Sequence, residues 1–179
     1  KSRKKFGSLS LLINNASKFE NDDIAKLNID SWNSHNNINL RAPLFLSRDF
    51  SKQMKKDAPG LIINIIDQRI FFPNPEFISY TSSKQSLMWL TQTLAQALSP
   101  QIRVCAIGPG PTLQGARQSK KDFENQSLST PLMIGSNPEE IYQAVKFIID
   151  IPSFTGQMIT LDGGEHLDWI KKENKNFKD

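Results

Sequence analysis

Short runs of apolar residues alternate along the chain with longer stretches in which apolar residues recur at helical spacing. The apolar runs, which we interpret as buried strands, cover residues 9–13, 61–66 and 102–107. The stretches with helical spacing cover residues 30–50, 80–98 and 137–148. Strands that alternate with helices form parallel sheets with helices packed on them, so the pattern predicts an α/β fold.

Local signals predict where two of these helices begin and where one of them is disturbed. Asp30 is a favourable N-cap for the first helix. Asn137, with Glu140 three residues later, forms a capping-box pattern for the last helix. Pro43 lies inside the first helix and has no N–H group for the carbonyl of Asn39, four residues back. We therefore expect a kink and a free carbonyl at Asn39.

Composition narrows the class of protein. With 179 residues, 38% of them hydrophobic, the chain is long enough for one domain with its own core, which we assign to residues 1–179. The net charge of +4 comes largely from lysines and arginines near the two ends. We interpret these as solvated termini rather than as a nucleic-acid site, because no binding motif accompanies them.

Cysteine and histidine usage argues against metal sites and disulfides. Cys105 is the only cysteine and lies in an apolar strand, which suits a reducing compartment. His35 and His166 have no metal-ligating companions at a useful spacing. No signal peptide and no apolar run of about 18 residues is found. We therefore expect a cytoplasmic protein without metal, nucleic-acid or membrane partners.

Tyr80 and Lys84 form the most informative pair in the sequence. On a helix, residues four apart lie on the same face, one turn apart. An ammonium beside a phenol favours the phenolate, so we expect the pKa of Tyr80 to lie below about 10 and the residue to exchange protons at neutral pH. Asp67 follows the strand at residues 61–66, at the edge where open α/β sheets bind ligands.

This arrangement resembles the short-chain dehydrogenase/reductase family. That family pairs the tyrosine and lysine with a residue thirteen positions before the tyrosine, usually serine, and Asp67 occupies that position here. An aspartate there is the pattern of the pteridine reductase branch, which the chain resembles more closely. Asn14, Asn15 and Ala16 match a further family motif, Asn-Asn-Ala-Gly, from which Ser17 departs as it does in the pteridine reductases.

The resemblance implies a doubly wound, Rossmann-like parallel sheet of which this chain is the C-terminal two-thirds. The glycine-rich phosphate loop of the family is absent, so we expect two strand–helix units upstream, on the order of 60–80 residues. Without them the strand at residues 9–13 would expose an apolar edge, and the fragment would associate or misfold. Residues 113–136 correspond to the substrate lid, residues 155–164 to the last strand with its Asp-Gly-Gly, and residues 165–179 to a polar tail.

The resemblance also implies the roles of individual residues. Tyr80, Lys84, Asp67 and Asn39 match catalytic positions; the carbonyl of Asn39 would hold a relay water. The cofactor-binding positions are Asn14, Ala16, Tyr80, Lys84, Pro109, Gly110 and Thr112, the last with a spacing that does not match cleanly. The substrate-binding positions are Ser17, Phe19 and Asp67. Phe19 would stack on a flat ring, and the alternative, a loop residue that caps the core, is equally weighted.

These matches predict an NAD(P)H-dependent reductase of a pterin-like substrate, with Tyr80 as the proton donor. NADP(H) is favoured over NAD(H) by analogy alone, and a homo-oligomer, dimer or tetramer, is expected. One alternative is a general carbonyl or 3-oxoacyl reductase in which Asp67 replaces the serine. A second alternative is a non-catalytic member of the family that acts as a binding or oligomer partner.

Overall fold

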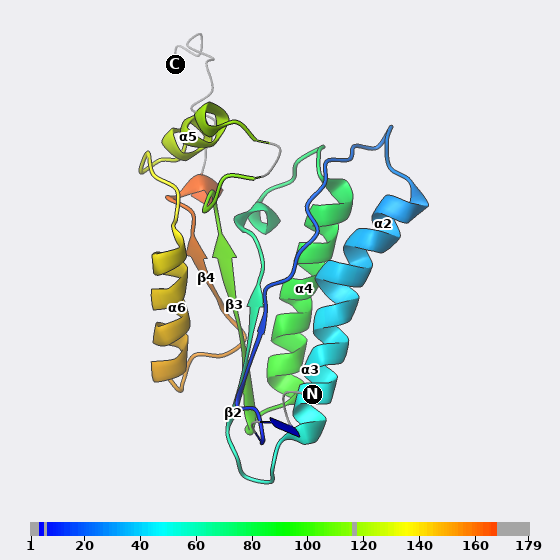
Figure 1. The fold of residues 1–179 in the computed structure, drawn as a ribbon, viewed down its shortest axis with the longest axis vertical. Helices are drawn as coiled ribbons and strands as arrows, with labels where there is room; N and C mark the ends of the chain where they lie inside the picture. Colours follow the sequence, from blue (N-terminus) through cyan, green and yellow to red (C-terminus); the bar gives the residue numbers. More distant parts are fainter. Residues whose placement is uncertain (1–3, 6, 116–117, 168–179) are drawn as a thin grey trace, which may run out of the picture.

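The protein folds around a parallel sheet with helices on both faces. A computed structural model describes residues 4–5, 7–115 and 118–167 (Figure 1). The four strands stand in the order β1-β2-β3-β4 and all pair in parallel. They are β1 (Leu11–Asn14), β2 (Gly60–Ile65), β3 (Ile102–Pro109) and β4 (Met158–Leu161). This confirms the predicted α/β, Rossmann-like fold, including the last strand.

Helices connect the strands in the order expected for a doubly wound sheet. Between β1 and β2 run α2 (Ile29–Asn36), a π-helical turn η1 (Asn37–Arg41) and α3 (Ala42–Gln53). A 3-10 turn η2 (Gln68–Phe71) and α4 (Ile78–Ala97) lead to β3. The chain then forms α5 (Lys120–Leu128), α6 (Pro138–Asp150), β4 and a last 3-10 turn η3 (Glu165–Leu167).

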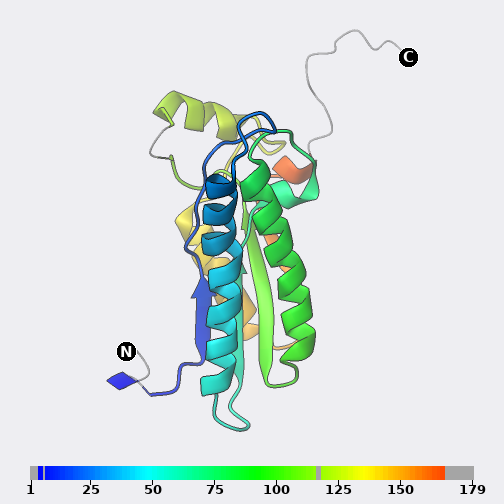
Figure 2. The same ribbon diagram turned by 90° about the vertical axis from the view of Figure 1, so that its right-hand side faces the viewer.

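The two faces of the sheet carry separate cores because successive side chains of a strand point to opposite faces. On one face, Ile62 and Val104 pack with Phe50 of α3 and Ala95 of α4. On the other face, four buried residues of β2 and β3 pack against Ala144 and Ile148 of α6; they are Leu61, Ile63, Cys105 and Ile107. Figure 2 shows α2 and α3 end to end in one helical path, which lies beside α4 in front of the sheet. Among the described residues, none of the helices is both long and apolar enough to cross a membrane.

Three local features refine the sequence-based expectations. The first helix begins at Ile29 with Asn28 as its N-cap, so Asp30 lies in the first turn and the prediction of an Asp30 cap is wrong. The predicted disturbance at Asn39 takes the form of a π-helical turn, in which the Ala42 N–H bonds the carbonyl of Asn37, five residues back. The predicted capping box of Asn137 is confirmed.

β1 lies at one edge of the sheet that the described residues form. Among the described residues, β1 pairs on one side alone, with β2, and Ile13 is 40% exposed. Of the segment predicted as a polar tail, residues 165–167 form η3, and residues 168–179 lie outside the described residues.

A buried chain of side-chain hydrogen bonds fixes the carboxyl ends of β1 and β2 against α4. Asn14 Nδ2 donates to Asn64 Oδ1 at 2.8 Å, and Asn64 Nδ2 donates to Thr91 Oγ1 at 2.9 Å. The Thr91 hydroxyl in turn donates to the carbonyl of Leu87 at 2.9 Å. Asn64 and Thr91 are fully buried, so this chain sets the distance between the sheet and the helix that carries Tyr80.

Replacing Asn64 by leucine removes the centre of this chain and leaves the buried Asn14 amide without its acceptor. We expect the free energy of unfolding to fall by roughly 2–4 kcal/mol, measured by chemical denaturation. As a control, Thr91→Ser keeps the hydroxyl and loses a methyl group, so it is expected to cost about 1 kcal/mol. An unchanged free energy of unfolding in Asn64→Leu would contradict the assignment.

Candidate active site

Tyr80, Lys84 and Asp67 meet at the carboxyl end of β2. Tyr80 and Lys84 lie one turn apart on the buried face of α4, with 5% and 2% of their surfaces exposed. Tyr80 Oη donates a hydrogen bond of 2.6 Å to Asp67 Oδ2. Lys84 Nζ donates one of 2.9 Å to the carbonyl of Ile65 and lies 5.7 Å from the centre of the Tyr80 ring. The structure therefore brings together the three residues that the sequence singled out.

Burial and the Asp67 carboxylate control the proton on Tyr80. Burial, followed by the charge of Asp67 and its hydrogen bond, raises the pKa of Tyr80 well above its ordinary value. The expectation of a lowered pKa is wrong for this structure, because burial of the phenol and then the neighbouring Asp67 carboxylate raise the pKa of Tyr80, while the Lys84 ammonium bonds the Ile65 carbonyl. Burial also lowers the pKa of Lys84 to about 8 and raises the pKa of Asp67. At neutral pH the phenol therefore holds its proton.

Asn39 links the loop after β1 to α4. Its side chain is fully buried in η1 and accepts hydrogen bonds from the Lys18 N–H at 2.7 Å and the Ser17 hydroxyl at 3.3 Å. Its amide nitrogen donates to the Lys18 carbonyl at 2.9 Å and to the Ser83 hydroxyl at 3.0 Å. Ser83 follows Tyr80 by three residues and donates to its carbonyl at 2.6 Å. The sequence indicated a role for the main-chain carbonyl of Asn39. The structure shows in addition that its side chain connects Lys18 to Ser83.

Phe19 lies beside Tyr80 and lines a cavity. Its ring stacks on Phe77 with 4.6 Å between the centres and meets Tyr80 edge-on at 4.6 Å. It is 46% exposed. Phe19 and Arg69 line both a cavity of about 1310 Å³, which Ser17 also lines, and a neighbouring one of about 180 Å³, which Asp67 lines.

Phe77 and Arg69 are site residues that sequence reasoning missed. Phe77 takes a left-handed conformation (φ 56°, ψ 40°) immediately before α4, which turns its ring toward Phe19. The Arg69 guanidinium lies 4.9 Å from the Phe77 ring centre, and the Arg69 N–H donates to Asp67 Oδ1 at 2.8 Å. A signal for Arg69 was present, since it follows Asp67 by two residues, the spacing at which aspartate caps a turn.

Of the residues predicted to border the cofactor, Asn14 and Thr112 form hydrogen bonds within the protein, whereas Ala16 is exposed. The Asn14 side chain is buried and bonded to Asn64, with its own Oδ1 partnerless among the described residues. Ala16 is exposed on the loop that follows. The Thr112 hydroxyl already donates to the Gly110 carbonyl at 3.0 Å and contacts the Ser136 hydroxyl at 2.6 Å, so its hydrogen bonds go to the protein.

The turn after β3 is packed against the turn after β4. The Gly110 N–H donates to the Leu161 carbonyl at 2.9 Å, directly after Pro109 at the end of β3. A Cβ on Gly110 would lie 2.7 Å from Asp162 Cβ and 2.8 Å from its Cα. Glycine is therefore required here by contact with the protein backbone itself.

The segment at residues 113–136, predicted as a lid, contains α5, and the chain just before it contacts its last residues. A Cβ on Gly135 would lie 2.2 Å from the Pro111 carbonyl oxygen, and one on Gly163 would lie 2.0 Å from the Ile134 carbonyl oxygen. The two ends of the segment therefore touch each other and the end of β4. From this base, Asp122 and Gln126 of α5 reach the larger cavity; residues 116–117 lie outside the described residues.

The histidines take part in local contacts. Within the described ranges, no cluster of three or more metal-ligating side chains occurs. His166 Nδ1 lies 2.7 Å from Asp162 Oδ2. His35, which the sequence marked as an ordinary residue, is fully buried and contacts the backbone of Glu20. No sequence pattern connects residues 35 and 20, because they meet across an irregular loop.

Comparisons with known proteins identify a family and several proteins of similar sequence and fold. The profile of the family described as short chain dehydrogenase matches residues 1–125. The crystal structure of FolM alternative dihydrofolate reductase 1 from Brucella suis, in complex with NADP, is 46% identical, covers 93% of this chain and 68% of that chain, and gives a TM-score of 0.91. The corresponding protein from Brucella canis, also complexed with NADP, is 44% identical, with coverages of 98% and 69% and a TM-score of 0.92.

A curated relative with a different activity is also similar. The 3-oxoacyl-[acyl-carrier-protein] reductase FabG of Thermotoga maritima is 29% identical over 165 residues, which are 89% of this chain and 67% of that protein. The chain thus spans about two thirds of the length of each of these relatives.

The influence of Asp67 on Tyr80 can be measured directly. In Asp67→Asn the negative charge is removed, so we expect the Tyr80 phenol to ionise at a lower pH than in the wild type. Phenolate absorbance during an alkaline titration reports this, and Tyr142→Phe in both proteins removes the only other tyrosine. Asp49→Asn, which removes an exposed carboxylate on α3, is the control and should leave the titration unchanged. Equal midpoints in Asp67→Asn and wild type would overturn the assignment.

Proposed function

Because the chain belongs to the short chain dehydrogenase family, we propose that it reduces a pterin-like ring with NADPH as the reductant. The observation that supports this most is the 2.6 Å hydrogen bond from the Tyr80 phenol to the Asp67 carboxylate, beside a cavity walled by Phe19. The similarity to two NADP-bound alternative dihydrofolate reductases favours the same substrate class and cofactor.

The protonation state of Tyr80 suits a reductase. Reduction of a C=N or C=O bond needs a proton at the heteroatom as well as a hydride at carbon. The raised pKa of Tyr80 keeps the phenol protonated at neutral pH, so the residue is ready to donate. Rotation of the hydroxyl about the Cζ–Oη bond would turn its proton from Asp67 toward a ligand in the adjoining cavity. Asp67 would take part in the proton supply through its charge: after donation, the carboxylate 2.6 Å from the phenolate raises the pKa of Tyr80 and so favours the return of a proton from solvent.

Asp67 and Phe19 explain why a pterin is preferred. A pterin presents a flat ring with amino and ring N–H donors along one edge. Asp67 offers two oxygens, each with a further lone pair beyond the bonds from Tyr80 and the Arg69 N–H. The Phe19 side chain, 46% exposed beside Tyr80, offers aromatic surface against which a flat ring can pack. A simple ketone would use neither feature.

The residues around Lys84 fit the nicotinamide cofactor that the family binds. When bound, the reduced nicotinamide supplies the hydride. Among the described residues the buried Lys84 ammonium has one hydrogen-bond acceptor, the Ile65 carbonyl, so two of its three N–H groups are left for the hydroxyls of a ribose. Asn14, Ala16, Pro109, Gly110 and Thr112 would border the cofactor at the same edge of the sheet.

Two further assignments belong to this proposal. Residues 113–136 would act as a substrate lid, supported by the side chains that α5 contributes to the larger cavity. The protein would form a homo-oligomer, dimer or tetramer, supported by three exposed apolar side chains on α6, Tyr142, Phe147 and Ile149.

A 3-oxoacyl reductase is the second candidate, favoured by the similarity to FabG. In that case Asp67 would replace the usual serine without taking part in substrate selection. A third candidate is a non-catalytic protein that acts as a binding partner. In that case the protein would keep its role without the Tyr80 hydroxyl.

Asp67→Ser separates the first two candidates. For a pterin reductase we expect kcat/KM with a dihydropterin to fall about 100-fold or more, because the ring loses its charged acceptor. Activity with a 3-oxoacyl thioester or a simple ketone should be unchanged or higher. NADPH oxidation is followed with each substrate, and Asp122→Asn serves as a control for a carboxylate that lines the cavity at α5. Ketone turnover alone in the wild type would favour the second candidate.

Tyr80→Phe tests whether the protein is an enzyme at all. Loss of the phenolic proton should lower kcat by about 10²–10⁴-fold, while NADPH binding, measured by its fluorescence, stays within a fewfold of the wild type. Tyr142→Phe, on the exposed face of α6, should leave both quantities unchanged. Full retention of activity in Tyr80→Phe would exclude the proposed proton donor.

A further inference from the structure

The loop at residues 17–22 carries Phe19 and is anchored through its backbone on both sides of that residue. On one side, the N–H and C=O of Lys18 bond the Asn39 side chain at 2.7 and 2.9 Å. Farther along, the Asp22 carbonyl accepts a hydrogen bond of 2.7 Å from the Phe77 N–H. The loop forms no helix or strand, so contacts of this kind, rather than a ladder of backbone bonds, hold it in place.

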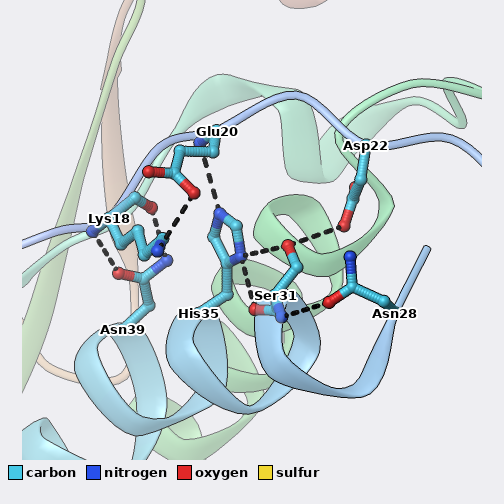
Figure 3. A network of polar contacts seen from close by, with 7 residues as sticks. All are labelled: Lys18, Glu20, Asp22, Asn28, Ser31, His35 and Asn39. Carbon is cyan, nitrogen blue, oxygen red and sulfur yellow. Dashed lines mark hydrogen bonds and ion pairs between the residues drawn. The ribbon is translucent and has the colours of Figure 1, made fainter. Parts of the chain in front are cut away.

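His35 supplies the anchor that directly follows Phe19. It lies in the last turn of α2 with none of its surface exposed. Its Nε2 lies 3.2 Å from the Glu20 N–H, and its Nδ1 lies 2.8 Å from the Ser31 carbonyl (Figure 3). A carbonyl accepts hydrogen bonds and does not donate them, which assigns the proton to Nδ1. Nε2 is then the acceptor for the Glu20 N–H.

We propose that His35 is a positioning residue for substrate: through the Glu20 amide it holds Phe19 where its ring can stack on the bound ring next to Tyr80. The inference rests on the proposed function and adds to it a residue outside the cavity. His35 contacts neither cavity, so its effect on substrate passes through the loop backbone.

The exposure of Phe19 is the reason that such an anchor is needed. With 46% of its surface exposed, Phe19 is not held by core packing on all sides. Its ring contacts include Phe77, Tyr80 and the Arg69 guanidinium, which lies 5.8 Å from the ring centre. Fixing the backbone immediately before and immediately after the residue restricts the direction in which its ring projects. Asn39 and His35, four residues apart, hold these two positions (Figure 3).

If His35 served only to fill space in the fold, a side chain of similar volume without a hydrogen-bond acceptor would replace it. Three substitutions separate the two roles. His35→Gln keeps an acceptor, Oε1, at about the position of Nε2. His35→Asn can still bond the Ser31 carbonyl but is too short to reach the Glu20 N–H. His35→Leu fills similar space without any acceptor. If His35→Leu fails to fold, the glutamine and asparagine variants still form a matched polar pair.

The first measurement is amide hydrogen exchange without substrate, and it does not depend on the proposed function. Exchange at the Glu20 amide should be roughly tenfold faster in the asparagine and leucine variants and close to the wild-type rate in the glutamine variant. Exchange in β2 and β3 should be unchanged. Equal Glu20 exchange in all folded variants, or a glutamine variant that exchanges as fast as the asparagine variant, would overturn the anchor.

The second measurement is steady-state kinetics with a dihydropterin and NADPH. Loss of the anchor should raise KM for the dihydropterin about five- to tenfold, with kcat within about twofold, and His35→Gln should restore KM. Unchanged KM in a variant with fast Glu20 exchange would show that the anchor does not serve substrate, which overturns the inference. A wild type that reduces no dihydropterin would refute the proposed function instead, and the positioning role toward a pterin with it, while the exchange pattern still decides the anchor.

Discussion

The hydrogen bond between the Tyr80 phenol and the Asp67 carboxylate joins the end of β2 to the beginning of α4, and the site is built around it. A second bond, from the Lys84 ammonium to the Ile65 carbonyl, ties the same strand to the next turn of the same helix. Tyr80 and Lys84 are both buried, so the geometry of the two bonds follows from how the helix packs on the sheet. The chain of amides and hydroxyls through Asn64 and Thr91 fixes that packing farther along α4.

The segment from α2 through η1 to α3 holds the opposite wall of the site. A π-helical turn inserts one additional residue into a helical path and rotates the side chains that follow. Asn39 lies within this turn, fully buried, and bonds both the loop after β1 and Ser83 on α4. One helical segment thus sets the distance between the aromatic face of Phe19 and the phenol of Tyr80, through side chains that need not touch a ligand.

Much of this arrangement could be predicted from the sequence, and the exceptions have physical causes. The strands, the capping box of Asn137 and the proximity of Tyr80, Lys84 and Asp67 follow from periodicity, spacing and a family resemblance. The direction of the Tyr80 pKa did not follow, because spacing shows which groups are neighbours and not how deeply they are buried. The role of His35 was equally hidden, since it depends on a backbone amide fifteen residues away in an irregular loop. Asn28 and Asp30 are both good caps, and sequence alone does not choose between them.

The glycine contacts at the base of residues 113–136 bear on how such a protein can change its substrate. Because Gly135 meets the Pro111 carbonyl and Gly163 meets the Ile134 carbonyl, the segment leaves the sheet and returns to it at nearly the same point. Chain between two fixed, touching ends can lengthen at small cost, since doubling a flexible loop costs only about 0.6 kcal/mol in closure entropy. Insertions, deletions and new sequences around α5 can therefore accumulate while β3, β4 and the cluster of Tyr80, Lys84 and Asp67 keep their geometry. The segment around α5 can therefore diversify in sequence and length, whereas the strands and the residues around Tyr80 cannot.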